Sequence, residues 1–153
     1  MRALLLIDIQ NDFMPGKQPF DIINLHGLEQ VLWPEHCIAG SSGAAFHPGL
    51  DTAPIAAVFR KGMDKHTDSY SAFYDNGRRR STRLADYLRA HGVTDIDVAG
   101  LAADFCVYFS IADALAEGFR VRLLEHATRA IDAEGFAKKK AGLLKHAGFS
   151  LAG

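Results

Sequence analysis

Three residues of types that serve nucleophilic catalysis follow short apolar runs in this sequence: Asp8, Lys61 and Cys106. If those runs are parallel strands, their carboxyl ends meet at one edge of a sheet, where ligands of such folds bind. A thiol in the first turn of a helix gains from the helix dipole, and a nearby ammonium lowers its pKa further. A carboxylate in the same place can take and return a proton. The set is therefore suited to attack on an amide carbonyl.

Each of the three residues also has an ordinary structural interpretation. A lone cysteine in a helix, such as Cys106, is most often part of the core. An aspartate after a strand, such as Asp8, is often a turn residue. The pair Lys61-Gly62 after an apolar run is typical of a solvated turn. On pattern alone, these interpretations are the commoner ones.

The elements that would position the three residues alternate along the chain. The apolar runs predict strands at 3–9, 57–60, 96–101, 119–125 and 149–151. Helical periodicity predicts helices at 82–91, 106–117 and 133–147. This alternation indicates a three-layer α/β/α fold with about five strands in a mostly parallel sheet. The run at 3–9 is apolar on both faces, which predicts a central strand. Residues 11–54 and 63–80 are expected to be irregular.

Composition sets the class of protein. The 153 residues are 48% hydrophobic and 23% charged, with a formal net charge of −1, which favours one soluble domain spanning 1–153. This charge gives no reason to expect nucleic acid or a membrane surface as a partner. No run is long enough for a membrane span or a typical signal-peptide core, which predicts a cytoplasmic protein. Two cysteines do not form a disulfide framework.

Four groups of residues, taken in order, resemble a known family. They are residues 7–13 (IDIQNDF), 32–37 (LWPEHC), 60–62 with 68–73 (RKG and DSYSAF), and 100–107 (GLAADFCV). Together they resemble the nicotinamidases and pyrazinamidases of the isochorismatase-like cysteine hydrolase superfamily. The fold that this resemblance implies is the α/β/α sandwich already indicated by the alternation of elements.

The resemblance implies conversion of nicotinamide to nicotinate and ammonia, a step of NAD salvage, through a cysteine thioester. Cys106 would be the nucleophile, Asp8 the general base and then acid, and Lys61 the cation that stabilises the thiolate. The backbone N–H groups of Ala102 and Cys106 would form the oxyanion hole. The family implies a cis peptide between Leu101 and Ala102.

The resemblance also assigns three aromatic residues to the substrate. Phe13, Trp33 and Tyr70 would line the pyridine ring. Without the motifs, Phe13 and Trp33 would be taken as core or loop packing residues.

The sequence departs from the family at its metal site, where a divalent ion such as zinc, iron or manganese is expected. A strand that carries an Asp-x-His motif is missing after Phe13, and residues 14–20 follow directly. Only His36 remains as a candidate ligand, whereas a catalytic metal needs about three protein ligands. His47 and the alternating polar residues at 64–68 are weaker candidates. We therefore expect this chain not to bind the metal tightly.

The missing segment also bears on geometry. In the family pattern, the missing strand lies between the strand of Asp8 and that of Lys61. Closing the gap would shift Lys61 by about one strand spacing of ~4.8 Å, which exceeds the tolerance of catalytic geometry.

Three hypotheses follow. The first is an amidohydrolase that acts on nicotinamide, with its activity impaired by the missing segment. The second is a non-catalytic remnant that serves as a binding or oligomerisation module. The third is a related hydrolase of another small amide. Homo-oligomerisation is left open by the sequence.

Overall fold

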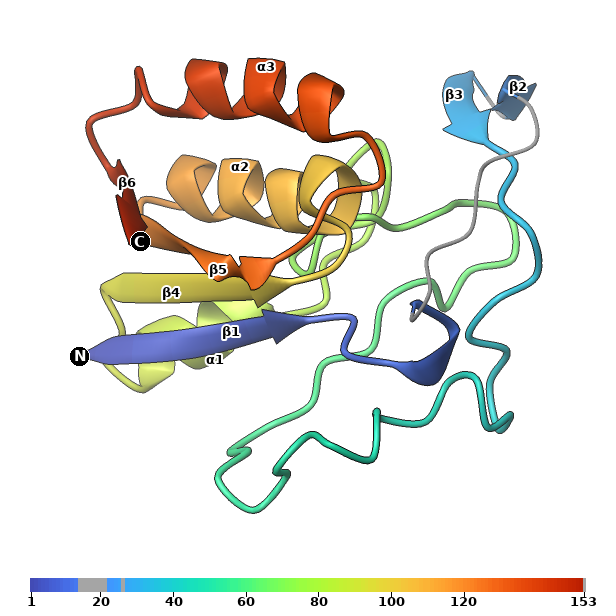
Figure 1. Ribbon diagram of the computed structural model, residues 1–153, viewed down its shortest axis with the longest axis horizontal. Helices are drawn as coiled ribbons and strands as arrows, with labels where there is room; N and C mark the ends of the chain where they lie inside the picture. Colours follow the sequence, from blue (N-terminus) through green and yellow to red (C-terminus); the bar gives the residue numbers. More distant parts are fainter. Residues whose placement is uncertain (14–21, 26, 153) are drawn as a thin grey trace.

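The computed structural model describes residues 1–13, 22–25 and 27–152, and its centre is a parallel sheet. Four strands form this sheet in the order β1-β4-β5-β6, and every neighbouring pair is parallel (Figure 1). The strands are β1 (Arg2–Ile7), β4 (Asp95–Gly100), β5 (Arg120–Thr128) and β6 (Phe149–Ala152). Residues 14–20, which belong to the region expected to be irregular, lie outside the described residues.

Helices cover both faces of the sheet. The helices are α1 (Leu84–Ala90), α2 (Tyr108–Ala116) and α3 (Ala133–Leu143). In Figure 1, α2 and α3 lie on one side of the sheet and α1 lies on the other. The predicted three-layer α/β/α class with a mostly parallel sheet is confirmed.

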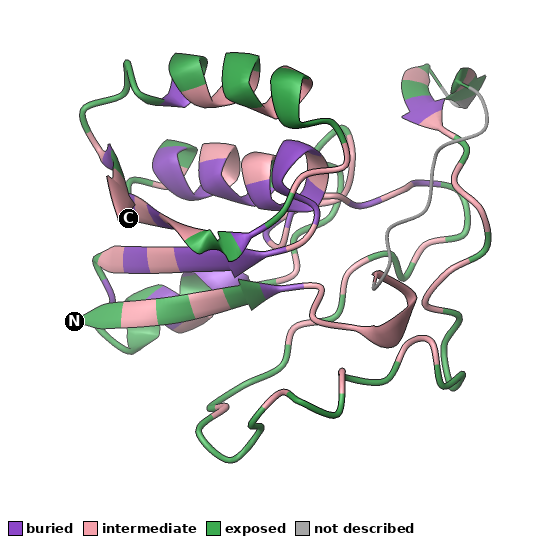
Figure 2. Ribbon diagram, viewed as in Figure 1, coloured by how far each residue is buried: buried purple, intermediate pink, exposed green. Residues whose placement is uncertain are grey.

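The core lies between β4, β5 and α2. Ile96, Val98, Leu123 and Ile111 are fully buried, and β4 is the most buried strand in Figure 2. Burial of one large aliphatic side chain contributes about 1.5–3 kcal/mol. The core therefore fixes β4, and β4 in turn carries the turn that contains Cys106.

Strand β1 is not central. Among the described residues it pairs only with β4, and its side chains Leu4 and Leu6 are 58% and 38% exposed (Figure 2). The prediction of a central strand was wrong, because the two-sided apolar pattern indicates that both faces suit burial but not that a neighbouring strand is present. The described part of the main sheet accordingly has four strands rather than about five.

The prediction of a strand at 57–60 was also wrong. Those residues pair with no strand, and Val58 is 54% exposed. A segment of four residues, of which three are apolar, is too short for periodicity to identify a strand. Conversely, the region expected to be irregular contains an antiparallel hairpin of β2 (Ile22–Leu25) and β3 (Leu28–Val31), as well as a 3₁₀ turn, η1 (Asn11–Phe13).

The remaining elements agree with the predicted ones to within a few residues. The predicted helix at 106–117 is divided into a π-helical turn, η2 (Ala103–Val107), and α2. None of the helices in the described part of the chain is long and apolar enough to cross a membrane.

The contact between β1 and β4 gives a test of the fold. A Cβ at Gly100 would lie 2.1 Å from the carbonyl oxygen of Ile7, and Gly100 has a φ of 125° that disfavours other residues. We expect Gly100→Ala to lower the free energy of unfolding by at least about 1 kcal/mol. Urea denaturation measures this change.

Gly142 is the matched control. It lies near the end of α3, and a Cβ there meets nothing within 4 Å. Gly142→Ala should raise the free energy of unfolding by about 0.5–1 kcal/mol, as expected for a helical glycine. Equal effects of the two substitutions would contradict the close contact between β1 and β4.

Candidate active site

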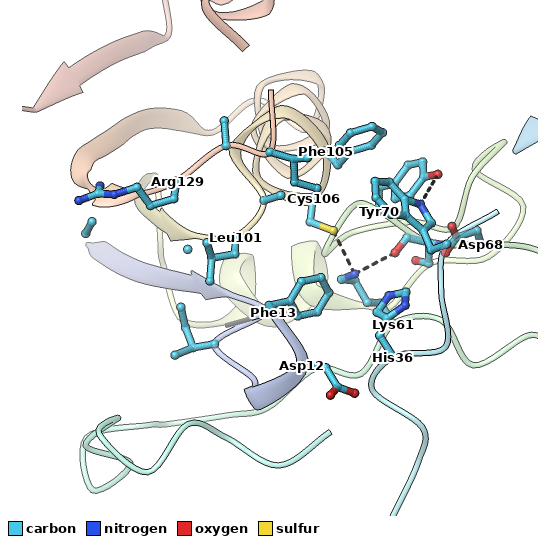
Figure 3. Close-up of a pocket in the computed structure, with 18 of the residues that line it drawn as sticks. Asp12, Phe13, His36, Lys61, Asp68, Tyr70, Leu101, Phe105, Cys106 and Arg129 are labelled. Carbon is cyan, nitrogen blue, oxygen red and sulfur yellow. Dashed lines mark hydrogen bonds between the residues drawn. The ribbon is translucent and has the colours of Figure 1, made fainter. Parts of the chain in front are cut away.

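Asp8, Lys61 and Cys106 meet at the carboxyl edge of the sheet. The Nζ atom of Lys61 lies 2.9 Å from Oδ2 of Asp8. It also lies 3.4 Å from Sγ of Cys106 (Figure 3). The lysine therefore joins the carboxylate and the thiol. The expected displacement of Lys61 by one strand spacing was wrong, because Lys61 comes from an irregular segment and its long side chain reaches both partners.

The pairing of β1 with β4 places Asp8 near the cysteine turn. Ile7 is in register with Gly100, and Leu101 N–H donates to the Ile7 carbonyl at 3.1 Å. Asp8 follows with a φ of 47°, a left-handed conformation that aspartate tolerates better than most residues. The peptide between Leu101 and Ala102 is cis, as the family resemblance implies.

Electrostatics distinguish the lysine from the thiol. Burial alone would lower the pKa of the Lys61 ammonium, but Asp8 and Cys106 more than offset this, so the pKa is raised and Lys61 stays charged. Burial raises the pKa of Cys106 to about 12, with Lys61 lowering it and Asp8 raising it. We expected the pKa of the Cys106 thiol to be lowered. It is raised instead, because the effect of burial exceeds that of the Lys61 charge. At neutral pH the resting Cys106 is therefore a thiol.

Asp8 is suited to take the thiol's proton. Its Oδ2 atom is buried and forms an ion pair with Lys61 Nζ at 2.9 Å. A carboxylate in this state, next to a thiol, can act as a general base.

Lys61 and Cys106 line a cavity of about 650 Å³ with aromatic walls. Trp33 Nε1 donates to the Tyr70 hydroxyl at 3.2 Å, and both rings pack against Phe105, with centroids 4.9 and 5.4 Å away. On another wall, Phe13 meets His36 edge to face at 5.3 Å. The three predicted ring-binding residues therefore line one cavity with Cys106.

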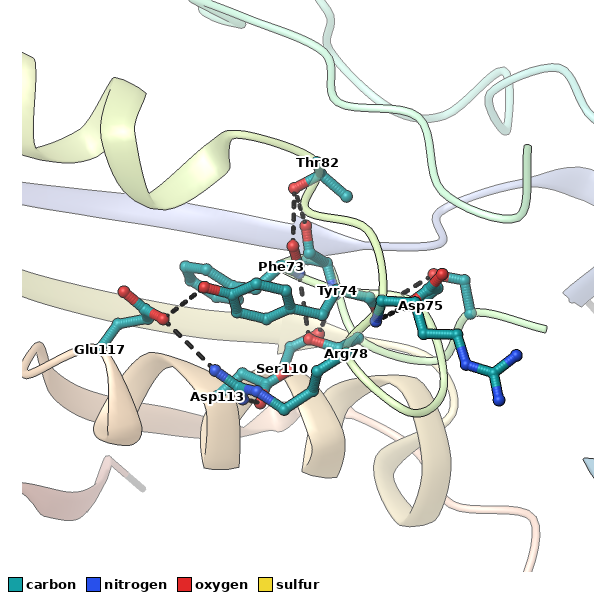
Figure 4. A network of polar contacts seen from close by, with 12 residues as sticks. Phe73, Tyr74, Asp75, Arg78, Thr82, Ser110, Asp113 and Glu117 are labelled. Carbon is teal, nitrogen blue, oxygen red and sulfur yellow. Dashed lines mark hydrogen bonds and ion pairs between the residues drawn. The ribbon is translucent and has the colours of Figure 1, made fainter. Parts of the chain in front are cut away.

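The loop that carries Tyr70 is tied to α2 by polar contacts. Ser110 is fully buried; it accepts from Ala72 N–H at 2.8 Å and donates to the Cys106 carbonyl at 2.6 Å. Further along, Tyr74 donates to Glu117 at 2.6 Å (Figure 4). These contacts fix the Tyr70 loop relative to the nucleophile turn.

Sequence reasoning missed two contributors to the site. Phe105 supplies part of the aromatic wall, and the Ser69 carbonyl accepts from Lys61 Nζ at 3.0 Å. Phe105 precedes Cys106, so its place in the turn was a usable signal. A backbone carbonyl leaves no signal in the sequence.

Within the described part of the chain, no group of side chains fits a catalytic metal. Among residues 1–13, 22–25 and 27–152, no three His, Cys, Asp or Glu side chains group to hold an ion. The Nδ1 atom of His36 lies 2.8 Å from the Pro34 carbonyl, and Asp12 accepts from Cys37 N–H at 2.7 Å. We therefore derive no chemical step through a metal.

The weaker candidate ligands are engaged in local turns. His47 Nδ1 accepts from Gly49 N–H at 3.1 Å, and Asp64 accepts from His66 N–H at 2.9 Å. Asp68 lines the cavity and accepts from Ser69 N–H at 2.7 Å.

Comparisons with known proteins agree with this geometry. Nicotinamidase of Escherichia coli is 46% identical over 117 residues, covering 76% of this chain and 55% of that protein. The nicotinamidase/pyrazinamidase of Mycobacterium tuberculosis is 32% identical over 169 residues, covering 88% and 89% of the two chains. The chain thus spans about half the length of the E. coli protein that it matches.

The fold is also similar to solved structures of nicotinamidases and pyrazinamidases. The Acinetobacter baumanii nicotinamidase superposes with a TM-score of 0.88 at 31% identity, covering 98% of this chain and 94% of that one. A protein of L. infantum, solved in complex with nicotinate, has a TM-score of 0.82 at 32% identity over 99% and 91%. A Pyrococcus horikoshii pyrazinamidase, solved with zinc, has a TM-score of 0.79 at 25% identity over 99% and 98%.

The fold and the site define an α/β protein with a cysteine, a lysine and an aspartate at the carboxyl edge of a parallel sheet. The model of the isochorismatase domain matches residues 22–150. The chain belongs to the isochorismatase family.

The charges around Cys106 predict its reactivity. In a Cys37→Ala background, alkylation of Cys106 by iodoacetamide should accelerate steadily from pH 7 to pH 10 without a plateau, because only the thiolate reacts. Asp8→Asn removes a charge that raises the pKa of the thiol, and should accelerate alkylation on the order of tenfold. Lys61→Met should slow it by a similar factor. Mass spectrometry measures the rates, and identical rates in the three proteins would contradict the assigned charges.

The lack of a group of metal-binding side chains among the described residues gives a second prediction. After dialysis against Zn²⁺, Mn²⁺ or Fe²⁺, elemental analysis should find well under one metal ion per chain, because His36 has no two further ligands beside it among the described residues. His36→Ala should leave that residual amount unchanged. One tightly held ion per chain, lost in His36→Ala, would overturn the prediction.

Proposed function

We propose that this chain is a cysteine amidohydrolase that converts nicotinamide to nicotinate and ammonia. The single observation that carries the proposal is the position of Lys61, whose Nζ atom contacts both Asp8 and Cys106 beside an aromatic cavity. The relatives named above, three of them nicotinamidases and a fourth bound to nicotinate, support the choice of substrate.

The first half of the reaction forms a thioester. Asp8 takes the proton of the Cys106 thiol as Sγ attacks the amide carbon, and an S–C bond forms. The N–H groups of Ala102 and Cys106 serve as donors to the oxyanion. The C–N bond then breaks, and the proton held by Asp8 passes to the leaving nitrogen, so that ammonia departs.

The second half hydrolyses the thioester. A water molecule gives a proton to Asp8 and attacks the acyl carbon, the C–S bond breaks, and the proton returns from Asp8 to the sulfur. The Lys61 ammonium stabilises the carboxylate and each thiolate that forms, because it stays charged throughout. The raised pKa of Cys106 makes this coupling of attack and proton transfer necessary, since a free thiolate is scarce at neutral pH.

The aromatic walls orient the substrate. Trp33, Tyr70 and Phe105 pack together as one wall, and Phe13 lies edge to face with His36 on another. A pyridine ring packed between these groups would present its carboxamide to Cys106. Ring packing of this type gains about 0.5–1.5 kcal/mol per pair beyond area burial.

We propose that the activity is weaker than that of an intact family member. The alignment with the M. tuberculosis protein runs over 169 positions, more than the 153 residues of this chain, which supports an internal gap. The poor fit of the present residues to a metal supports the loss of a group that would hold the ring. Because Lys61 is in place, this loss should weaken substrate binding more than the chemical step.

Two alternatives make different demands on Cys106. A non-catalytic binding or oligomerisation module does not need a lysine that contacts both a carboxylate and a thiol, so the contacts of Lys61 with Asp8 and Cys106 favour the enzyme. A hydrolase of another small amide would use the same three residues, so only a substrate panel separates it from the proposed activity.

The decisive assay measures ammonia release from nicotinamide and benzamide by the whole chain. We expect slow hydrolysis that Cys106→Ala lowers at least about a thousandfold, as loss of a nucleophile does. Without a metal to hold the pyridine nitrogen, benzamide and nicotinamide should have comparable kcat/KM. Cys37→Ala is the matched control and should retain activity. Turnover that survives Cys106→Ala after repurification would reject the mechanism, and strong preference for nicotinamide would reject the proposed weakening.

A further inference from the structure

The turn that carries Cys106 depends on support from outside itself. The π-helical turn η2 begins after Ala102 without a side-chain cap. π-Helical turns are rare, and they are less stable than the α-helix that could replace them. Contacts from neighbouring elements must therefore hold Cys106 within reach of Lys61.

Asp104 provides two of these contacts through its buried side chain. It lies two residues before Cys106 and is 3% exposed. One carboxylate oxygen accepts from Ile131 N–H at 3.0 Å, and the other accepts from Asp132 N–H at 2.9 Å. A buried carboxylate is costly unless it is hydrogen-bonded, so these two bonds are strongly favoured.

Two further bonds join the same turn to the same neighbouring segment. Ala103 N–H donates to the Arg129 carbonyl at 2.8 Å, and Lys139 Nζ of α3 donates to the Asp104 carbonyl at 2.6 Å. The Lys139 ammonium also lies 4.9 Å from the centre of the Phe105 ring. The residues from 129 to 139 thus hold η2 at consecutive positions.

We propose that Asp104 is a positioning residue, which fixes η2 against the segment between β5 and α3 and so holds Cys106 Sγ at Lys61 Nζ. This role rests on the proposed use of Cys106 as the nucleophile. It also links one wall of the cavity to the reactive group, because Arg129 and Ile131 line the cavity into which Cys106 opens.

Asp104 acts through geometry rather than through its charge on the thiol. The charged groups that act on Cys106 are Lys61 and Asp8, whereas the Asp104 carboxylate faces the N–H groups of Ile131 and Asp132. Asparagine has nearly the same shape, but it places an NH₂ donor against one of those N–H groups. Asp104→Asn therefore disturbs the two hydrogen bonds to Ile131 and Asp132 with little change in packing.

Asp75→Asn is the matched control. Asp75 accepts from two consecutive backbone N–H groups, those of Arg79 at 2.6 Å and Arg80 at 3.0 Å, and it does not line the cavity. Both bonds of Asp75 end on Oδ1, which asparagine keeps, so Asp75→Asn controls for replacing an aspartate by asparagine away from the nucleophile turn. Only Asp104 is joined to the nucleophile turn.

The experiment measures iodoacetamide alkylation of Cys106 from pH 7 to pH 10, with the folded state checked by circular dichroism. Asp104→Asn should slow alkylation at each pH, as Lys61→Met does, because Sγ moves away from the ammonium. Where hydrolysis is measurable, kcat should fall about ten- to a hundredfold with KM nearly unchanged. Asp75→Asn should alter neither quantity.

Lys139→Met keeps the test decisive if Asp104→Asn fails to fold. It removes one bond to η2 while retaining an apolar side chain over Phe105, and it should slow alkylation in the same direction. Unchanged alkylation in a folded Asp104→Asn, or in Lys139→Met, would overturn the positioning role. Slower alkylation in a chain that never hydrolyses amides would support the role and reject the proposed function.

Discussion

The structure depends on burying one ammonium group. The Lys61 side chain is 20% exposed, and transfer of an ion from water into a protein costs several kcal/mol unless partners replace the water. Here the partners are the Asp8 carboxylate, the Cys106 sulfur and the Ser69 carbonyl. They come from three separate stretches of the chain, so the charge is tolerated only where all three stretches converge.

That convergence follows from the parallel pairing of β1 with β4. Parallel strands end at the same edge of a sheet, so the residues after Ile7 and Gly100 are neighbours wherever the two strands pair. The absence of a side chain at Gly100 lets the strands approach closely at that edge. Ser110 then joins the Cys106 carbonyl to the loop that carries Tyr70, so the nucleophile and the aromatic wall share one support.

The sequence allowed the main α/β elements to be predicted, because the β4–α2 and β5–α3 units repeat an apolar run followed by helical periodicity. It did not reveal what covers β1, since the run at 2–7 has the same pattern whether or not a neighbour is present. The strand expected at 57–60 failed for a related reason: four residues do not define a period. The position of Lys61 depended on side-chain reach, and the buried partners of Asp104 are backbone groups, so neither could be predicted from residue types.

The exposed edge of β1 shows where the proposed gap takes effect. Leu4 and Leu6 remain exposed, and burial of each leucine would contribute about 1.5–3 kcal/mol. The loss of that burial free energy is a large fraction of a domain's net stability of about 5–15 kcal/mol. The contacts at Lys61 are intact all the same, because they depend on β1, β4 and the segment from 61 to 69 and not on a further strand. If the proposed gap is present, we expect its structural cost to fall on stability and on binding of the substrate ring, because the contacts among Asp8, Lys61 and Cys106 are in place.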